Sequence, residues 1–295
     1  MLLTHSAVSG DQRPDLNGGA LMKDLQVRAN GTVLRCRVEG PLAAQALLFS
    51  NGIATNLTMW DAQAAHFANQ YQVIRYDARG HGCSQATSAP YSLSTLVEDV
   101  RSLLDGLGVG AVHFVGLALG GMVGQLFAAR YPQRLLSVTL CDTTARVKPD
   151  IWKGRIEAVR KEGVASEVEA SLEQWFTPSF RKANPETIDR FRQMIENTSR
   201  EGYLGCATAI MELEGLGHLS RIATPALVVA GRNDPATPAG DAQFLSDRIS
   251  GSQLALIEDA AHLPNVERPA AFNKILECFL QEQTARSRHA SPFVP

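Results

Sequence analysis

The fold is decided by the stretch "HFVGLALGGMVGQ", residues 113–125. It begins with the end of an apolar strand, continues through Gly-Leu-Ala-Leu-Gly-Gly and ends as the start of an apolar helix. A strand-to-helix turn this sharp strains its central residue and leaves no room for side chains two positions to either side. Gly116 and Gly120 leave that room, and Gly121 lets the helix pack closely. The pattern predicts a sharp turn centred on Ala118, whose methyl group can neither attack a substrate nor be activated.

Short apolar runs recur on both sides of this stretch, and helical patterns separate them. Runs of this length suit strands that are buried on both faces of a parallel sheet. Such strands are expected at residues 46–50, 71–77, 111–116, 135–142, 225–231 and 253–259. Before them, Asn30-Gly31 is a strong type I′ turn signal between the two strands of a hairpin. The chain is therefore predicted to be an α/β protein with a mostly parallel, doubly wound sheet.

One segment, residues 146–219, interrupts this alternation of strand and helix. Its patterns are helical and charged, with aromatic residues interspersed and no convincing strand. We therefore expect a helical cap, inserted over one end of the sheet between the strands at 135–142 and 225–231. The domain organisation predicted is a polar, loose extension (1–22), an α/β core (23–145 and 220–284), the cap (146–219) and a tail (285–295).

Composition excludes several classes of function. With 295 residues, 45% of them hydrophobic, the chain can bury a large core. A net charge of -2 argues against nucleic-acid binding, and there is no polybasic patch for a membrane. Five scattered cysteines without C-x-x-C spacing argue against a zinc ribbon or a disulfide framework. With neither a signal peptide nor a membrane-spanning run in the sequence, we expect a cytoplasmic protein; its oligomeric state stays open.

Two further residues with catalytic chemistry follow strands, where enzymes of this class place their functional loops. Asp234 comes shortly after the strand at 225–231, and His262 lies in the loop after the strand at 253–259. Alone, each would be an ordinary loop residue. In the order turn centre, acid, histidine, they indicate nucleophilic catalysis, with His262 as general base and then acid and Asp234 fixing its tautomer. Asp142, which also follows a strand, is the alternative acid.

The loop after the strand at 46–50 is expected to complete an oxyanion hole. An oxyanion needs two preorganised backbone N–H groups, one from this loop and one from the residue after the nucleophile. Our assignment is Ile53 and Leu119. Asn51 and Gly52 set the course of the loop, and Asn51 is also a candidate for the substrate pocket.

Aromatic residues and a second histidine give weaker signals. Trp152 and Trp175 are candidates for the pocket wall, although packing within the cap is the alternative for both. Trp60 is expected in the core. His81 lies in "DARGHGCS", which is interpreted as a structural turn rather than as a second catalytic site.

Several stretches together resemble the α/β-hydrolase superfamily, and their sequences are most similar to the 3-oxoadipate enol-lactonase-like branch. They are "FSNGIATNLTMWDAQ", "VIRYDARGHGCS", "FVGLALGGMVGQ", "GRNDPATP" and "DAAHLPNVERP", and the resemblance covers about residues 22–283. It implies a serine hydrolase without cofactor or metal, which cleaves small-molecule esters or lactones through an acyl-enzyme. The chain departs from the family in its amino-terminal extension and in Ala118, where the family has serine.

The alanine has two interpretations. In the first, the protein is an engineered, inactive form of a serine hydrolase. In the second, it is a natural relative that binds a ligand without catalysis. A lineage released from catalysis has no reason to keep Asp234, His262 and the turn glycines together, so we favour the engineered form. Hydrolysis of C–C bonds or amides by the same triad is a further alternative, because the distinction lies in the geometry of the cap.

Overall fold

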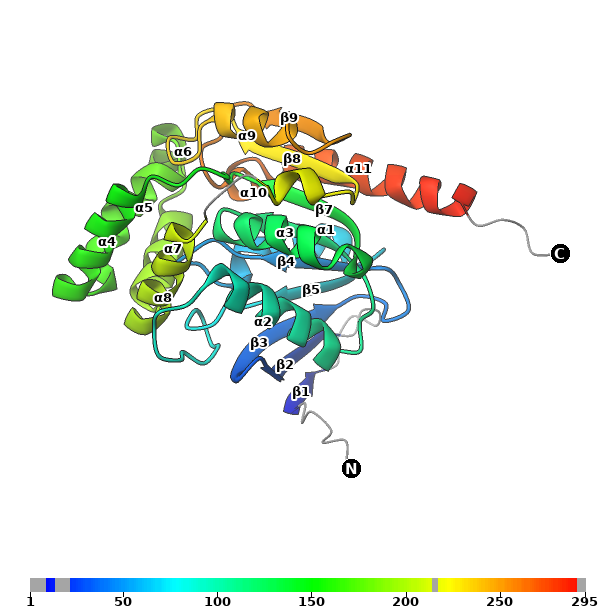
Figure 1. The fold of residues 1–295 in the computed structure, drawn as a ribbon. Helices are drawn as coiled ribbons and strands as arrows, with labels where there is room; N and C mark the ends of the chain where they lie inside the picture. Colours follow the sequence, from blue (N-terminus) through cyan, green and yellow to red (C-terminus); the bar gives the residue numbers. More distant parts are fainter. Residues whose placement is uncertain (1–8, 14–21, 214–216, 291–295) are drawn as a thin grey trace.

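The computed structural model describes residues 9–13, 22–213 and 217–290. It contains a nine-stranded sheet in the order β1-β2-β3-β5-β4-β6-β7-β8-β9 (Figure 1). The first three strands are antiparallel to their neighbours, and the strands from β4 to β9 are parallel to one another. The bounds are β1 Ser9–Arg13, β2 Met22–Ala29, β3 Thr32–Glu39, β4 Ala46–Ser50, β5 Gln72–Tyr76, β6 Val112–Leu117, β7 Leu135–Cys141, β8 Ala226–Gly231 and β9 Gln253–Ile257.

The strands follow the hydrophobic pattern of the sequence. Every residue of β4, β6 and β8 is buried, as expected for central strands that are covered on both faces. In β3 buried and half-buried residues alternate, which is the pattern of a strand with one covered face. Asn30 and Gly31 both have positive φ, 45° and 74°, as the type I′ turn of the β2–β3 hairpin requires.

Helices cover both faces of the sheet. α2 (Leu93–Gly106) and α3 (Leu119–Arg130) pack side by side on one face, and α1 (Asp61–Phe67) packs with α11 (Pro269–Ala290) on the other. α9 (Ala239–Ser246) packs against β8 and β9, and the short α10 (Pro264–Glu267) precedes α11. This arrangement confirms the predicted doubly wound α/β fold.

Between β7 and β8 the chain forms a group of helices at one end of the sheet (Figure 1). They are α4 Pro149–Glu162, α5 Val168–Trp175, α6 Pro178–Ala183, α7 Pro185–Glu196 and α8 Arg200–Met211, with 3-10 turns at Val164–Glu167 and Leu219–Arg221. Among the described residues of 146–219 there is no strand. We call this segment the cap.

The chain ends differ from what we expected. Strand β1 lies inside the segment 1–22, which was expected to be loose, because its backbone pairs with β2 from Ser9↔Gln26 to Arg13↔Met22. The rest of that segment up to residue 21 lies outside the described residues. At the other end, α11 continues to Ala290, into the range expected to be a tail.

Two further expectations concern cysteines and membranes. All five cysteines are unpaired in the structure. Within the described residues, every helix is too short or too polar to cross a membrane.

His113, on β6, makes the stability of the fold depend on pH. Its Nδ1 lies 2.8 Å from the Ser137 hydroxyl, and burial lowers the pKa of His113 from 6.5 to about 4. The unfolded chain therefore takes up a proton near pH 6.5 that the folded chain resists until about pH 4. We expect the free energy of unfolding to fall by roughly 2–3 kcal/mol from this residue as the pH is lowered through that window.

Urea unfolding at several pH values checks this expectation. His113→Gln should weaken the pH dependence without abolishing it, because burial also lowers the pKa of His81 to about 4. The same change at exposed His66 is the control. An unchanged pH dependence in the His113 variant would contradict the account.

Candidate active site

The turn between β6 and α3 has the strained geometry that its sequence predicts. Ala118 has φ 52° and ψ −111°. A Cβ atom on Gly116 would lie 2.2 Å from the Gly120 carbonyl oxygen, and one on Gly120 would lie 2.3 Å from the Ser50 carbonyl oxygen. Both contacts are with backbone, which cannot move aside cheaply. The two glycines therefore allow the chain to present residue 118 at the tip of the turn.

Neighbouring strands fix this turn in place. The Ala118 N–H donates to the Cys141 carbonyl at 3.0 Å, and the Thr143 hydroxyl donates to the Ala118 carbonyl at 2.8 Å. The Gly120 N–H donates to the Asn51 carbonyl at 3.0 Å. Residue 118 is thus anchored to the ends of both strands beside β6.

Asp234 and His262 are in contact, as expected from the sequence. His262 Nδ1 lies 2.7 Å from Asp234 Oδ2. The Thr237 hydroxyl donates to the same oxygen at 2.6 Å, and the N–H groups of Ala236 and Thr237 donate to Oδ1. Burial alone would raise the pKa of Asp234, but His262 and the Thr237 hydrogen bonds lower it below its ordinary value. Asp234 is therefore an anion that can orient the imidazole and stabilise its protonated form.

The loop that carries His262 is fastened on both sides of the histidine. The Ala261 N–H donates to Glu267 Oε1 at 2.8 Å, and the Leu263 N–H donates to the Trp175 carbonyl at 3.2 Å. Glu267 also accepts from the Thr177 hydroxyl at 2.7 Å. Since Trp175 and Thr177 belong to the cap, the cap helps to hold the histidine in place.

Asp142, the alternative acid, is not the hydrogen-bond partner of His262. It is buried, and its Oδ1 accepts from the Gly231 N–H at 2.8 Å. Its other oxygen has no donor in the described part of the chain.

A cavity of about 170 Å³ lies between the turn and the cap. It is lined by Ala118 and His262, by Ile53 and Leu119, and by cap residues that include Trp152, Trp175 and Ile210. Neither the Ile53 N–H nor the Leu119 N–H donates to any acceptor among the described residues. Two unused N–H groups at the wall of a cavity are what an oxyanion hole requires.

The pocket candidates divide into two groups. Trp152 and Trp175 line the cavity, although Trp175 is also largely buried within the cap. Asn51 is not among the lining residues, so the structure does not place it at this cavity as expected. The Asn51 side chain is buried, and both ends of its amide are already used. Nδ2 donates to the Tyr76 carbonyl, and Oδ1 accepts from Trp60 Nε1. His81 is also buried elsewhere, with Nδ1 against the Arg79 carbonyl at 3.0 Å.

Comparison with known proteins identifies the family. A family model described as the alpha/beta hydrolase fold matches residues 45–269. The chain belongs to the α/β-hydrolase family. Its similarity to enol-lactonases also confirms the predicted branch: it is 37% identical to 3-oxoadipate enol-lactonase 2 of Acinetobacter baylyi over 86% of this chain and 95% of that protein. 3-Oxoadipate enol-lactonase 1 of the same organism is 33% identical, over 85% of this chain and 94% of that protein.

A solved structure gives the same result for this α/β hydrolase. The enol-lactonase of Burkholderia xenovorans superimposes with a TM-score of 0.85 at 35% identity, over 87% of this chain and 99% of that one. The order of Ala118, Asp234 and His262 along the chain is the order nucleophile, acid and histidine of this family.

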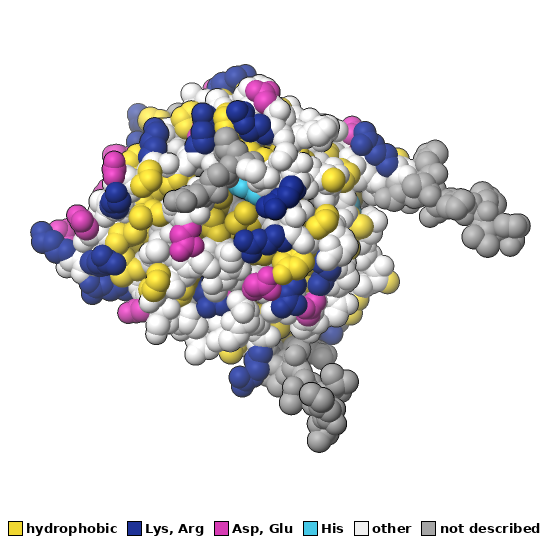
Figure 2. All heavy atoms as spheres, in the orientation of Figure 1, with side chains coloured by type: hydrophobic (Ala, Val, Ile, Leu, Met, Phe, Trp, Pro, Cys, Tyr) yellow, Lys and Arg dark blue, Asp and Glu magenta, His cyan; other side chains and the backbone are white. Residues whose placement is uncertain are grey.

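Sequence reasoning missed the basic side chains of the hydrolase pocket. Arg146, Lys148 and Arg155 line the cavity, and Asp241 is the acidic residue that lines it. Figure 2 shows basic side chains interspersed with hydrophobic ones on the face that carries the cap helices. The balance of charges over the whole cap concealed them, because only the fold shows which of its charged residues face the cavity.

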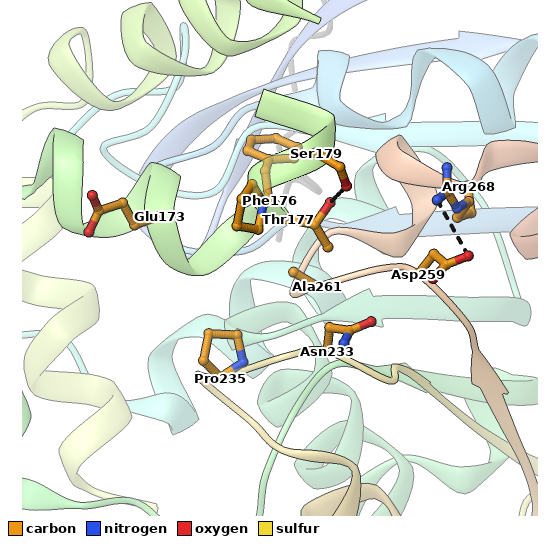
Figure 3. Close-up of a pocket in the computed structure, with 10 residues that line it drawn as sticks. Glu173, Phe176, Thr177, Ser179, Asn233, Pro235, Asp259, Ala261 and Arg268 are labelled. Atoms are coloured by element: carbon orange, nitrogen blue, oxygen red, sulfur yellow. Dashed lines mark hydrogen bonds and ion pairs between the residues drawn. The ribbon is translucent and has the colours of Figure 1, made fainter. Parts of the chain in front are cut away.

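A second, more open hollow of about 590 Å³ lies beside the loop of Asp234 (Figure 3). Its wall includes Phe176, Thr177 and Asn233, with an ion pair between Arg268 and Asp259 at 3.8 Å. Neither Ala118 nor His262 lines it. The smaller cavity, which both residues line, is therefore the candidate active site.

Proposed function

We propose that this hydrolase cleaves a small ester or lactone through an acyl-enzyme when serine occupies position 118, and that the alanine present replaces that serine. The observation that carries the proposal is the 2.7 Å contact between His262 and Asp234 beside a cavity whose wall also includes Ala118. A histidine oriented by a buried carboxylate is a general base.

The mechanism follows from the positions of these groups. A serine hydroxyl at position 118 would lie about 2.6–3.2 Å from His262 Nε2. His262 takes the hydroxyl proton as the oxygen attacks the carbonyl carbon, and the N–H groups of Ile53 and Leu119 stabilise the oxyanion. His262 then protonates the leaving oxygen, and an acyl-enzyme forms. Water, deprotonated by the same histidine, attacks the acyl carbon and releases the acid and the serine hydroxyl.

The charges at the cavity favour a substrate that itself carries a carboxylate. Three basic residues and one acidic residue line the wall, and Arg146 is already paired with that acid, Asp241, at 3.1 Å. The side chain of Arg155 is only 17% exposed, and Glu167, at 3.5 Å from its Nε, offsets part of its poorly screened charge. Lys148 adds a basic group that has no ion pair with any described residue. The relatives named above as 3-oxoadipate enol-lactonases agree with a lactone that bears an acid group.

Arg155→Gln should weaken the binding of such a substrate to the present alanine chain by about 10- to 100-fold, because a charge-assisted hydrogen bond is lost. Calorimetry compares an enol lactone that carries a carboxylate with its methyl ester. The alanine chain is suitable because it keeps the cavity wall while lacking the nucleophile.

The matched control is Lys153→Gln on the same helix, whose side chain is 60% exposed and does not line the cavity. This variant should bind both ligands as the parent does. If Arg155→Gln weakened binding of the acid and the methyl ester equally, the cavity would not select for a carboxylate.

A further inference from the structure

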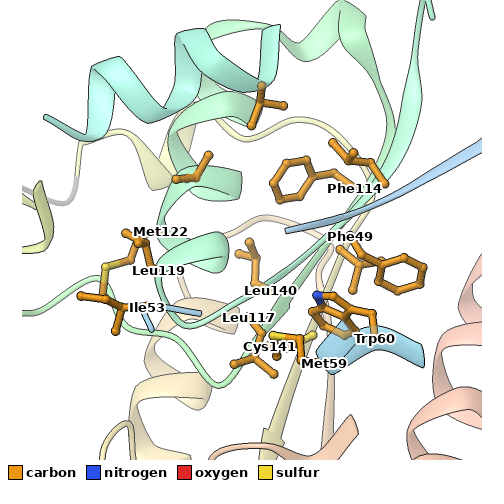
Figure 4. Close-up of a cluster of buried hydrophobic side chains, with 14 of the residues drawn as sticks. Phe49, Ile53, Met59, Trp60, Phe114, Leu117, Leu119, Met122, Leu140 and Cys141 are labelled. Carbon is orange, nitrogen blue, oxygen red and sulfur yellow. The ribbon is translucent and has the colours of Figure 1, made fainter. Parts of the chain in front are cut away.

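Asp142 is a buried carboxyl group that the mechanism above does not use. It follows Cys141, which lies in the apolar cluster beneath the turn (Figure 4). Its backbone has φ 39°, in the left-handed region that residues other than glycine rarely adopt. Strain of this kind persists only where the surroundings hold the residue in place.

The position of Asp142 connects the parts of the site. Its neighbours Cys141 and Thr143 bond the backbone of Ala118, while its own N–H donates to the Val229 carbonyl at 2.9 Å. Its Oδ1 accepts from the Gly231 N–H, at the end of the strand that leads to Asp234.

Its carboxyl group lies beside the acid–histidine pair. Polar side-chain atoms of Asp142, Asp234 and His262 lie within 4.8 Å of one another, and all three residues are buried. Asp234 accepts hydrogen bonds from two N–H groups, the Thr237 hydroxyl and His262. Asp142 has one such donor, and its Oδ2 has none in the described part of the chain.

Two adjacent buried carboxyl groups cannot both ionise cheaply, so the better solvated one carries the charge. Because Asp234 has more hydrogen-bond donors than Asp142, the negative charge is more stable on Asp234 and the proton belongs on Asp142. Burial, and then the neighbouring Asp234 carboxylate, raises the pKa of Asp142 well above its ordinary range, and Glu267 acts in the same direction. A proton on Oδ2 also removes the otherwise unexplained buried acceptor, because an O–H group can donate to Asp234.

We propose that Asp142 is a positioning residue of the triad: its carboxyl group is protonated in the working enzyme and donates a hydrogen bond to the Asp234 carboxylate, which holds that carboxylate toward His262. The link to catalysis rests on the proposed function, whereas the protonation of Asp142 does not.

Infrared spectroscopy tests the protonation in the alanine chain itself. A protonated carboxyl group has a C=O stretching band distinct from that of a carboxylate. At neutral pH, with isotope-labelled aspartate, this band should be lost in Asp142→Asn and kept in the control Asp24→Asn, because Arg35 lowers the pKa of Asp24 to about 2. A spectrum without a difference at Asp142 would show an ionised carboxylate and overturn the proposal, whatever the enzyme does.

Kinetics in the Ala118→Ser background tests the role. Asp142→Asn places an amide N–H where the O–H was and keeps an acceptor for Gly231, so kcat should stay within about threefold of the parent. Asp142→Leu removes the donor and should lower kcat by about 10- to 100-fold. If Asp142→Leu does not fold, Asp142→Asn still decides: a folded variant with kcat reduced by tenfold or more would refute a neutral donor.

Discussion

Ala118→Ser should create hydrolysis of small activated esters or lactones, at a rate about 10⁶-fold above that of the present chain. Three features of the structure match the other parts that the proposed mechanism needs. The turn holds residue 118 at φ 52°, His262 is oriented by Asp234 at 2.7 Å, and the N–H groups of Ile53 and Leu119 are unused. In the proposed mechanism, the missing part is the nucleophilic oxygen. A chromogenic ester and an enol lactone, assayed with both chains, measure the effect.

The alternative, that alanine is the natural residue at position 118, makes the opposite prediction. In a natural ligand-binding relative, His262, Asp234 and the two N–H groups would not need a geometry that supports catalysis. No activity after restoration, tested across esters, lactones, amides and β-diketones, would favour that interpretation. Activity on amides or β-diketones alone would keep the triad and change the bond that it cleaves.

Within the restored enzyme, His262→Ala should lower kcat by about 10⁶-fold and Asp234→Asn by about 10⁴-fold. The histidine moves the proton in both half-reactions, whereas the aspartate fixes its tautomer and stabilises its charge. The two variants combined should cost little more than His262→Ala, because residues that act as a unit are not additive. Single-turnover kinetics with a chromogenic ester gives these ratios.

His66→Ala is the matched control, since His66 is exposed and does not line the cavity. It should leave kcat unchanged. A small loss in Asp234→Asn, together with a large loss in Asp142→Asn, would mean that Asp142 is the working acid.

The strands and the turn could be predicted because local chemistry determines them. The expected strand at 46–50 has the bounds of β4, since a continuous apolar run can be satisfied only by burial on both faces. Gly116 and Gly120 marked the turn because no other residue fits against the backbone there. Asp234 and His262 followed from the rule that functional loops come after strands.

What the sequence did not reveal depends on contacts between distant residues. Asn51 lies one residue after β4, but its amide is used by Tyr76 and Trp60, and no local pattern shows this. Arg155 is one of many cap cations, and only the packing of α4 places it at the cavity. The role of Thr237, by contrast, could have been predicted from the sequence. A threonine three residues after an acid can donate a hydrogen bond to it within a turn, as Thr237 does to Asp234.

The most direct test of the central claim is the mass of the intact protein after exposure to a fluorophosphonate, which reacts with activated serines. The account predicts one covalent adduct per chain in the Ala118→Ser protein, located by peptide mapping at position 118, and no adduct in the present chain. It also predicts that His262→Ala abolishes labelling in the restored protein. An unlabelled Ala118→Ser protein, or labelling of the present chain at another residue, would contradict the assignment of position 118 as the site of the nucleophile.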